Sequence, residues 1–110
     1  MRYAGLADDP EHGAAQRYLG GHGSGVLTFG LPGGREAGAR FLDALKLFTR
    51  LVNLGDAKSL ATHPASTTHR QLDAAELAKA GVSEDTVRLS IGIEHIGDLR
   101  ADLEQALAGA

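Results

Sequence analysis

The residue best suited to chemistry in this chain is an arginine in the middle of an alternating segment. Residues 87–94 read VRLSIGIE, and the first five alternate between apolar and polar side chains. This alternation is typical of a strand with one buried face, so Arg88 and Ser90 should point away from the core. A guanidinium can hold a carboxylate through two parallel hydrogen bonds. Arg88 is therefore a candidate carboxylate anchor, or else a strand arginine that lies in solvent or pairs with Glu94 or Asp85.

Two other segments carry polar side chains that could bind a small polar ligand. Asn53 stands at the end of an apolar stretch, and its amide offers both a donor and an acceptor. Residues 63–69 read HPASTTH, in which the hydroxyl of Thr68 is a candidate contact. The structural alternatives are an asparagine that enters a turn and a loop threonine bonded to its own backbone.

Residue types that support metal binding or catalysis elsewhere are poorly spaced here. His63 and His69 are separated by a segment with a proline, and the chain has no cysteine, so we expect no metal site. The glycine-rich residues 20–25 precede an expected strand, whereas a phosphate-binding loop opens a helix. No serine, histidine and acid form a recognisable nucleophilic triad.

Size and composition indicate one globular domain. The chain has 110 residues, of which 43% are hydrophobic, and a formal net charge of −3. That charge leaves no broad basic field for nucleic acid or for an anionic membrane. No apolar run approaches the roughly 20 residues that span a bilayer. The absence of cysteine is typical of a cytoplasmic protein, which is the location we expect.

The elements expected around these residues alternate between strands and helices. Strands are predicted over 26–31, 51–54, 59–62 and 87–91, and helices over 14–19, 35–48, 74–80 and 96–107. The third helix has Asp73 as its N-cap, Glu76 three residues later and Gly81 to end it. Few short strands between helices favour an α/β (α+β) domain with a small, mainly antiparallel sheet and helices on one face.

Residues 53–60 (NLGDAKSL), 63–69 and 87–94 together resemble the C-terminal domain of the cystathionine γ-synthase-like family of pyridoxal-phosphate (PLP) enzymes. The match extends from residues 3–6, which resemble the family's YPGL, to the end of the chain. In the family, the arginine of the pattern R-[LIV]-S-x-G-[LIV]-E clamps the substrate's α-carboxylate, and Arg88 matches it. The resemblance implies that Arg88, Asn53 and Thr68 bind this carboxylate, within the C-terminal domain of a fold-type I PLP-dependent transferase.

The resemblance also implies an activity. Asn53 and Lys58 are typical of the branch that uses O-acetyl-L-homoserine, in which sulfide replaces acetate to give homocysteine for methionine biosynthesis. This points to an O-acetylhomoserine sulfhydrylase. The same domain of a cystathionine γ-synthase or γ-lyase is an alternative, as is a free-standing binding or assembly module without catalysis.

A division of labour follows from the same resemblance. Residues 1–13 would lead in from an upstream domain that carries the Schiff-base lysine and binds PLP, and residues 14–110 would form the substrate-side domain. No residue of the chain would then be catalytic or bind the cofactor, and the chain alone should be inactive. The expected partners are an amino-acid substrate, the PLP domain of the same polypeptide and further copies in a homotetramer, with no nucleic acid and no membrane.

Overall fold

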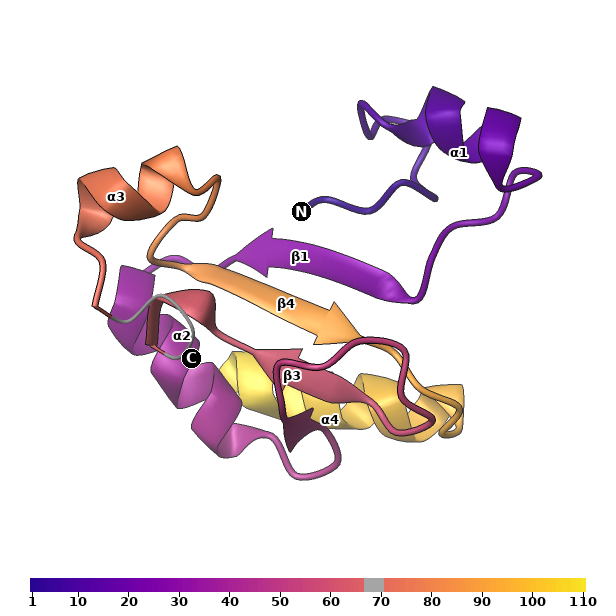
Figure 1. The fold of residues 1–110 in the computed structure, drawn as a ribbon. Coiled ribbons are helices and arrows are strands. Elements are labelled where there is room, and N and C mark those ends of the chain that lie inside the picture. The colour runs from indigo at the N-terminus through magenta and orange to yellow at the C-terminus, as the bar shows by residue number, and fades with distance from the viewer. Residues whose placement is uncertain (67–70) are drawn as a thin grey trace.

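The computed structural model describes residues 1–66 and 71–110, and a four-stranded sheet lies at its centre (Figure 1). The elements in chain order are α1 (His12–Tyr18), β1 (Val26–Gly30), α2 (Gly34–Ala44), β2 (Thr49–Arg50), β3 (Leu60–Thr62), the 3₁₀ turn η1 (Pro64–Ser66), α3 (Ala74–Lys79), β4 (Thr86–Ser90) and α4 (Ile96–Ala108). The strand order is β1-β4-β3-β2. β4 is antiparallel to both β1 and β3, and β2 is parallel to β3. The mainly antiparallel sheet predicted from the sequence is confirmed.

Helices α2 and α4 pack against one face of the sheet and bury its side chains (Figure 1). The buried core consists of Leu31, Ala37, Phe41, Leu42, Phe48, Ala61, Val87, Leu89, Leu99 and Ala106. The rings of Phe29 and Phe41 meet edge to face, with centroids 5.6 Å apart, which joins β1 to α2. Val87 and Leu89 belong to this core, so the predicted alternation of β4 is confirmed and Arg88 lies on the other face.

Helix α2 ends at Ala44, although the apolar spacing predicts a helix as far as Phe48. The backbone N–H groups of Lys46, Leu47 and Phe48 donate to the Asp102 carboxylate of α4, at 2.9, 2.8 and 3.1 Å. A continued helix would need the same N–H groups for carbonyls four residues earlier. The carboxylate therefore ends α2 and turns the chain toward β2.

The strand predicted over 51–54 is wrong, because the strand in this region is β2 and residues 51–59 form a crossover. β2 runs parallel to β3, with Thr49 opposite Leu60. Two parallel neighbours require the chain to return to the same end of the sheet between them. The apolar side chains that suggested a strand, those of Leu51, Val52 and Leu54, are between 41% and 55% exposed. They lie in the returning segment and not in the sheet.

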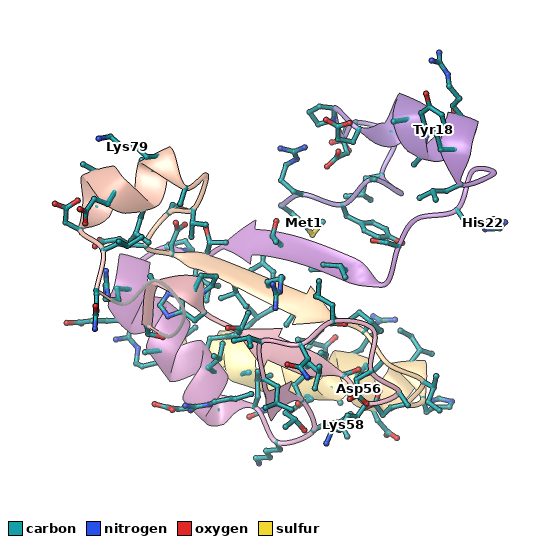
Figure 2. The ribbon with its side chains drawn as sticks, in the orientation of Figure 1. Met1, Tyr18, His22, Asp56, Lys58 and Lys79 are labelled. Carbon is teal, nitrogen blue, oxygen red and sulfur yellow. The ribbon has the colours of Figure 1, made fainter. Side chains whose placement is uncertain are left out.

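The N-terminal segment pairs with the edge strand β1 through one isolated antiparallel β-bridge. The backbone N–H of Arg2 donates to the Thr28 carbonyl at 2.7 Å, and the Thr28 N–H donates back at 3.1 Å. Figure 2 shows Met1 over β1, while Tyr18 and His22 mark α1 and its following loop farther from the sheet. The start of the chain is thereby held beside the open face.

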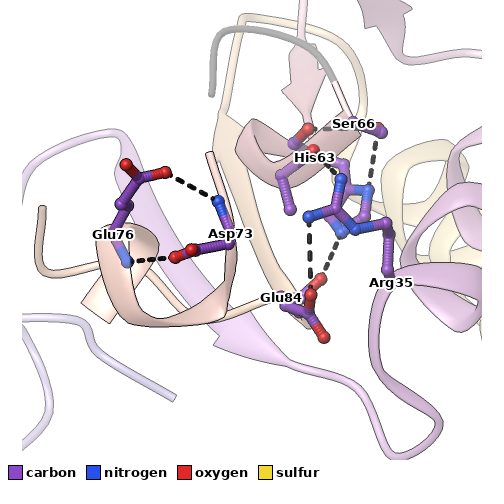
Figure 3. A network of polar contacts seen from close by, with 7 residues as sticks. Arg35, His63, Ser66, Asp73, Glu76 and Glu84 are labelled. Atoms are coloured by element: carbon purple, nitrogen blue, oxygen red, sulfur yellow. Dashed lines mark hydrogen bonds and ion pairs between the residues drawn. The ribbon is translucent and has the colours of Figure 1, made fainter. Parts of the chain in front are cut away.

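The shorter elements follow their local signals. Asp73 accepts a hydrogen bond from the Glu76 N–H at 2.8 Å, and the Glu76 carboxylate accepts one from the Asp73 N–H at 3.0 Å (Figure 3). This confirms the capping box predicted for α3. Gly81, with a φ of 76°, follows the helix as predicted. None of the helices in the described part of the chain is long and apolar enough to cross a bilayer.

The role of Asp102 gives a prediction for acid stability. Burial would raise the pKa of Asp102, but the three backbone N–H donors and the Gln105 amide outweigh it, so the pKa is lowered. The carboxylate's contribution is then complete above its ordinary pKa of about 4 and is lost as the pH falls through the lower folded value. Asp102→Asn should cost about 2–3 kcal/mol in denaturant unfolding at neutral pH, since charged acceptors bind N–H groups more strongly.

The control for this experiment is Asp8→Asn, which makes the same change at an exposed position. Stability of both variants should be followed by urea unfolding from pH 7 to pH 2. The difference between Asp102→Asn and the unchanged chain should shrink as the pH falls below the ordinary pKa of an aspartate and Asp102 becomes protonated. A loss equal to that of Asp8→Asn at every pH would contradict the assignment.

Candidate carboxylate-binding site

A row of polar residues crosses the open face of the sheet at Arg88. In the strand register, Arg88 lies between Thr28 of β1 and Thr62 of β3, and Arg2 pairs with Thr28 beyond β1. Residues that are directly opposite in antiparallel strands point to the same face. Arg88 is half-buried and Thr62 is buried. The guanidinium therefore leaves the sheet between two threonine hydroxyls, on the face that the helices leave open.

A hollow of about 360 Å³ lies over this row. Thr28, Thr62, Thr86 and Arg88 border it, and Pro64 adds an apolar wall. Its size suits a small molecule, because ligand pockets typically range upward from about 300 Å³. The hollow thus combines two arginines, Arg88 and Arg2, with several hydroxyls, and Arg2 is already paired with Asp9. This combination is suited to a small anion.

The guanidinium of Arg88 makes one hydrogen bond within the described residues. Its Nη2 donates to the carbonyl oxygen of Val52, which lies in the crossover. No carboxylate of residues 1–66 or 71–110 lies within ion-pair distance of Arg88, so the pairing with Glu94 or Asp85 that the sequence left open is not formed. A guanidinium has five N–H donors, and one carbonyl leaves most of them available.

The crossover passes over the open face because the strand segment after Arg88 binds it. Ser90 Oγ accepts a hydrogen bond from the Gly55 N–H at 3.2 Å, and the Ile93 N–H donates to the Ala57 carbonyl at 2.9 Å. A Cβ atom on Gly92 would lie 2.3 Å from the Ala57 carbonyl oxygen and 2.7 Å from the Ser59 nitrogen. Only glycine permits this close approach of two backbones.

Glu94 completes this attachment through both oxygens of its carboxylate. Oε1 accepts from the Ser59 N–H and Oε2 from the Ser59 hydroxyl, each at 2.7 Å. Ser59 Oγ in turn accepts from the Gly92 N–H at 2.8 Å. The hydrogen bonds from the Ser59 backbone and hydroxyl lower the pKa of Glu94, because they favour its charged form. The carboxylate is therefore an ionised acceptor at neutral pH.

The three predicted ligand residues differ in what the structure shows of them. Arg88 borders the hollow, as described above. Asn53 is exposed in the crossover, directly after the Val52 whose carbonyl accepts from Arg88. Thr68 lies outside the described residues. Sequence reasoning missed the positioning contacts of Ser90 and Glu94, although their spacing of two and six residues from Arg88 was visible in the segment VRLSIGIE.

His63 is buried beside the hollow's lining residues Thr62 and Pro64 and does not line the hollow itself. Its ring is fully buried, with Nδ1 2.8 Å from Ser66 Oγ and Nε2 2.7 Å from the Glu84 carbonyl oxygen (Figure 3). A Cβ on Gly38 of α2 would lie 2.4 Å from Nε2, so the helix packs directly on the ring. Within the described ranges, no three His, Cys, Asp or Glu side chains are grouped so that they could hold a metal ion. The second histidine of the predicted segment, His69, lies outside those ranges.

The lysines do not fit a covalent attachment site for PLP. Lys46, Lys58 and Lys79 are all exposed, and none borders the hollow. Figure 2 shows Lys58 on the crossover and Lys79 on α3, near opposite ends of the sheet. A reactive amine of this kind needs an apolar pocket or a neighbouring cation. Lys46, Lys58 and Lys79 thus lack the surroundings of a covalent attachment site for PLP.

A family model for Cys/Met metabolism PLP-dependent enzymes matches residues 1–108. The chain belongs to this family. It is 55% identical over 108 residues to O-acetyl-L-homoserine sulfhydrylase 1 of Thermus thermophilus, an alignment that covers 98% of this chain and 26% of that protein. It is 50% identical over 107 residues to L-methionine gamma-lyase of Pseudomonas putida, with coverages of 97% and 27%.

Among solved structures, the chain is similar to an O-acetylhomoserine (thiol)-lyase from Campylobacter jejuni. The TM-score is 0.85 at 46% identity, over 96% of this chain and 25% of that one, which carries an N'-pyridoxyl-lysine-5'-monophosphate residue. The chain therefore has a fold of the fold-type I PLP-dependent enzymes, and it spans about a quarter of the length of these relatives. The family resemblance inferred from residues 53–69 and 87–94 is confirmed.

The close approach at Gly92 gives a prediction for this site. Gly92→Ala should force the crossover away from the strand, because the new methyl group would overlap backbone atoms that cannot turn aside. We expect a loss of about 1–3 kcal/mol in denaturant unfolding. The amide resonance of Gly55 should also shift, since its bond to Ser90 depends on the crossover's position.

Gly13→Ala is the matched control, because a Cβ there meets nothing within 4 Å. This glycine lies in α1, where alanine is the better helix former by roughly 1 kcal/mol. Gly92→Ala should thus lower the free energy of unfolding, and Gly13→Ala should raise it. If Gly92→Ala unfolds at the same urea concentration as the unchanged chain, the contact does not constrain the crossover.

Proposed function

We propose that this chain is the substrate-carboxylate-binding domain of a PLP-dependent O-acetyl-L-homoserine sulfhydrylase. The observation that carries the proposal is the state of Arg88. Arg88 is half-buried, borders a hollow of about 360 Å³ and has no carboxylate partner in the described part of the chain. Most of the five N–H donors of this guanidinium are unused within the described residues, and a planar guanidinium binds carboxylates well. The α-carboxylate of an amino acid would supply that partner.

The surroundings of Arg88 favour a bound carboxylate over bulk water. Thr28 and Thr62 lie on either side of it in the register, and hydroxyls can donate hydrogen bonds to an anion. The Val52 carbonyl holds one edge of the guanidinium and leaves the other N–H groups for the ligand. Asn53, the next residue along, offers an amide donor from the crossover side. Thr68 belongs to the same proposal through the family's pattern alone.

The role we assign to Arg88 is positional. PLP supplies the electron sink for amino-acid chemistry, and the protein supplies binding and orientation. A carboxylate fixed at Arg88 would orient the amino acid so that its other end meets the reacting groups. We propose that PLP and its lysine belong to another domain of the same polypeptide and that the complete enzyme is a homotetramer. On this division, the 110-residue chain alone is inactive.

A γ-lyase is the second candidate, because an L-methionine gamma-lyase is 50% identical to this chain. Both reactions begin with an amino acid held by its α-carboxylate, so the same anchor would serve either one. The sulfhydrylase is favoured by the relative at 55% identity and by a second O-acetyl-L-homoserine sulfhydrylase, from Corynebacterium glutamicum, at 48%.

Arg88 can be tested in a hybrid enzyme. Residues 1–108 would replace the matching quarter of the Thermus thermophilus relative, and homocysteine formation from O-acetyl-L-homoserine and sulfide would be measured. Arg88→Ala should lower kcat/KM by roughly a hundredfold or more, since misplacement of a substrate by about 1 Å can cost that much. Arg88→Lys should recover only part of the loss, because an ammonium lacks the planar fork.

The control is Arg100→Ala, which removes an arginine that is 73% exposed on α4. It should leave kcat/KM unchanged. The visible absorbance of bound PLP should stay the same in all variants, which would separate substrate binding from cofactor binding. An Arg88→Ala hybrid with undiminished kcat/KM would refute the anchor. If a hybrid on the Pseudomonas putida lyase recovers more of its parent's activity than the Thermus hybrid does, the γ-lyase is the better assignment.

A further inference from the structure

We infer that Glu94 is a positioning residue, which fixes the crossover through Ser59 so that the Val52 carbonyl and Asn53 lie beside Arg88. The inference rests on the proposed carboxylate site and adds a second determinant to it. Glu94 does not touch the proposed ligand and has no ion-pair contact with Arg88 among the described residues. Its effect on the ligand would be exerted entirely through the backbone of the crossover.

Both carboxylate oxygens of Glu94 accept a hydrogen bond from Ser59, and the Ser59 hydroxyl both donates and accepts. Ser59 is fully buried, and its N–H and hydroxyl both donate to the carboxylate at 2.7 Å. The hydroxyl oxygen then accepts from the Gly92 N–H, so its acceptor side is used as well. A carboxylate is the side chain that offers two acceptor oxygens and no donor. An amide of the same shape would turn a donor toward one of the two Ser59 donors.

The position of the crossover depends on where it is fixed at Ser59. Residues 51–58 belong to no helix or strand and are exposed. The segment after Arg88 holds the crossover through the bonds of Ser90 with Gly55, Ile93 with Ala57, and Gly92 and Glu94 with Ser59. Arg88 itself bonds Val52, and the Thr49 N–H donates to the Ser59 carbonyl at 3.0 Å. Most of the bonds that hold the crossover beside Arg88 thus come from the strand that carries Arg88 and the segment after it.

This arrangement predicts that the Arg88 guanidinium can be present and yet be wrongly oriented for a ligand. Without the Glu94 carboxylate, Arg88 keeps its charge and its strand position but loses the fixed carbonyl that orients it. Asn53 would move with the same segment. A carboxylate ligand should then bind more weakly although every residue proposed to touch it is still present.

The test uses the 110-residue chain with Glu94→Gln and, as control, Glu104→Gln. Glu104 is 73% exposed on α4, where its described ion pair is with Arg100 at 4.0 Å, so the control removes the same charge without a positioning contact. L-Methionine is the probe, titrated while the amide and Arg88 Nε resonances are recorded. Glu94→Gln should raise the probe's Kd about tenfold, speed amide exchange at Gly55 and Ser59, and shift the Arg88 Nε resonance. Glu104→Gln should change none of these.

Two further variants separate positioning from simple loss of stability. Ser59→Ala removes the hydroxyl bond to Glu94 and the acceptor of the Gly92 N–H, so it should weaken probe binding as well. In the double variant the two losses should be less than additive, because both changes break the hydroxyl–carboxylate bond. Leu103→Ala destabilises the core under α4, on the face of the sheet opposite the crossover, and should leave the probe's Kd unchanged while the chain is folded. If Leu103→Ala weakens binding as much as Glu94→Gln, the effect is one of stability and the inference is overturned.

Arg88→Ala distinguishes failure of the inference from failure of the proposed function. If Arg88→Ala abolishes probe binding and Glu94→Gln leaves it unchanged, the anchor stands and the positioning role is wrong. If the unchanged chain and Arg88→Ala respond alike to the probe, the proposed function fails. The exchange rates and the Arg88 Nε resonance then decide the inference alone: a change in Glu94→Gln supports it, and values equal to those of Glu104→Gln overturn it.

Discussion

The parallel pairing of β2 with β3 is the constraint from which the site follows. Consecutive parallel strands oblige the chain to travel back along the sheet, and here the helices already occupy one face. The return must therefore cross the other face, where it meets the polar row at Arg88. Asp102 sets the start of this path by ending α2, and Glu94 sets its finish at Ser59. Two carboxylates that touch no ligand thus determine where the crossover runs.

The alternation of apolar and polar side chains in β4 has two consequences. Val87 and Leu89 enter the core beneath α2 and α4, which fixes the strand's height and rotation. Because side chains alternate, the same packing dictates that Arg88 and Ser90 face the crossover. A slip of one residue would bury the guanidinium and expose the core residues, so the hydrophobic pattern also specifies the site. Placement of the charge is in this sense a consequence of core packing.

The features predicted correctly from the sequence are those with local causes. Alternation revealed the orientation of Arg88, and the spacing of Asp73 and Glu76 revealed the capping box of α3. The end of α2 could not be read locally, because the acceptor for Lys46 is Asp102, 56 residues later. The crossover was mistaken for a strand for a similar reason: its bonds to Ser90 and Glu94 span 35 residues. The role of Thr68 stays a prediction.

The proposed anchor requires that a positive charge stay available although a negative charge lies six residues away in the sequence. A strand arginine and a nearby glutamate would ordinarily neutralise each other. Glu94 is instead saturated by two donors from Ser59, and its lowered pKa reflects that satisfaction. Arg88 is oriented by a neutral carbonyl, which does not neutralise its positive charge. By giving each group a separate partner, the crossover keeps the pair apart and leaves guanidinium donors available for the carboxylate that we propose as the ligand.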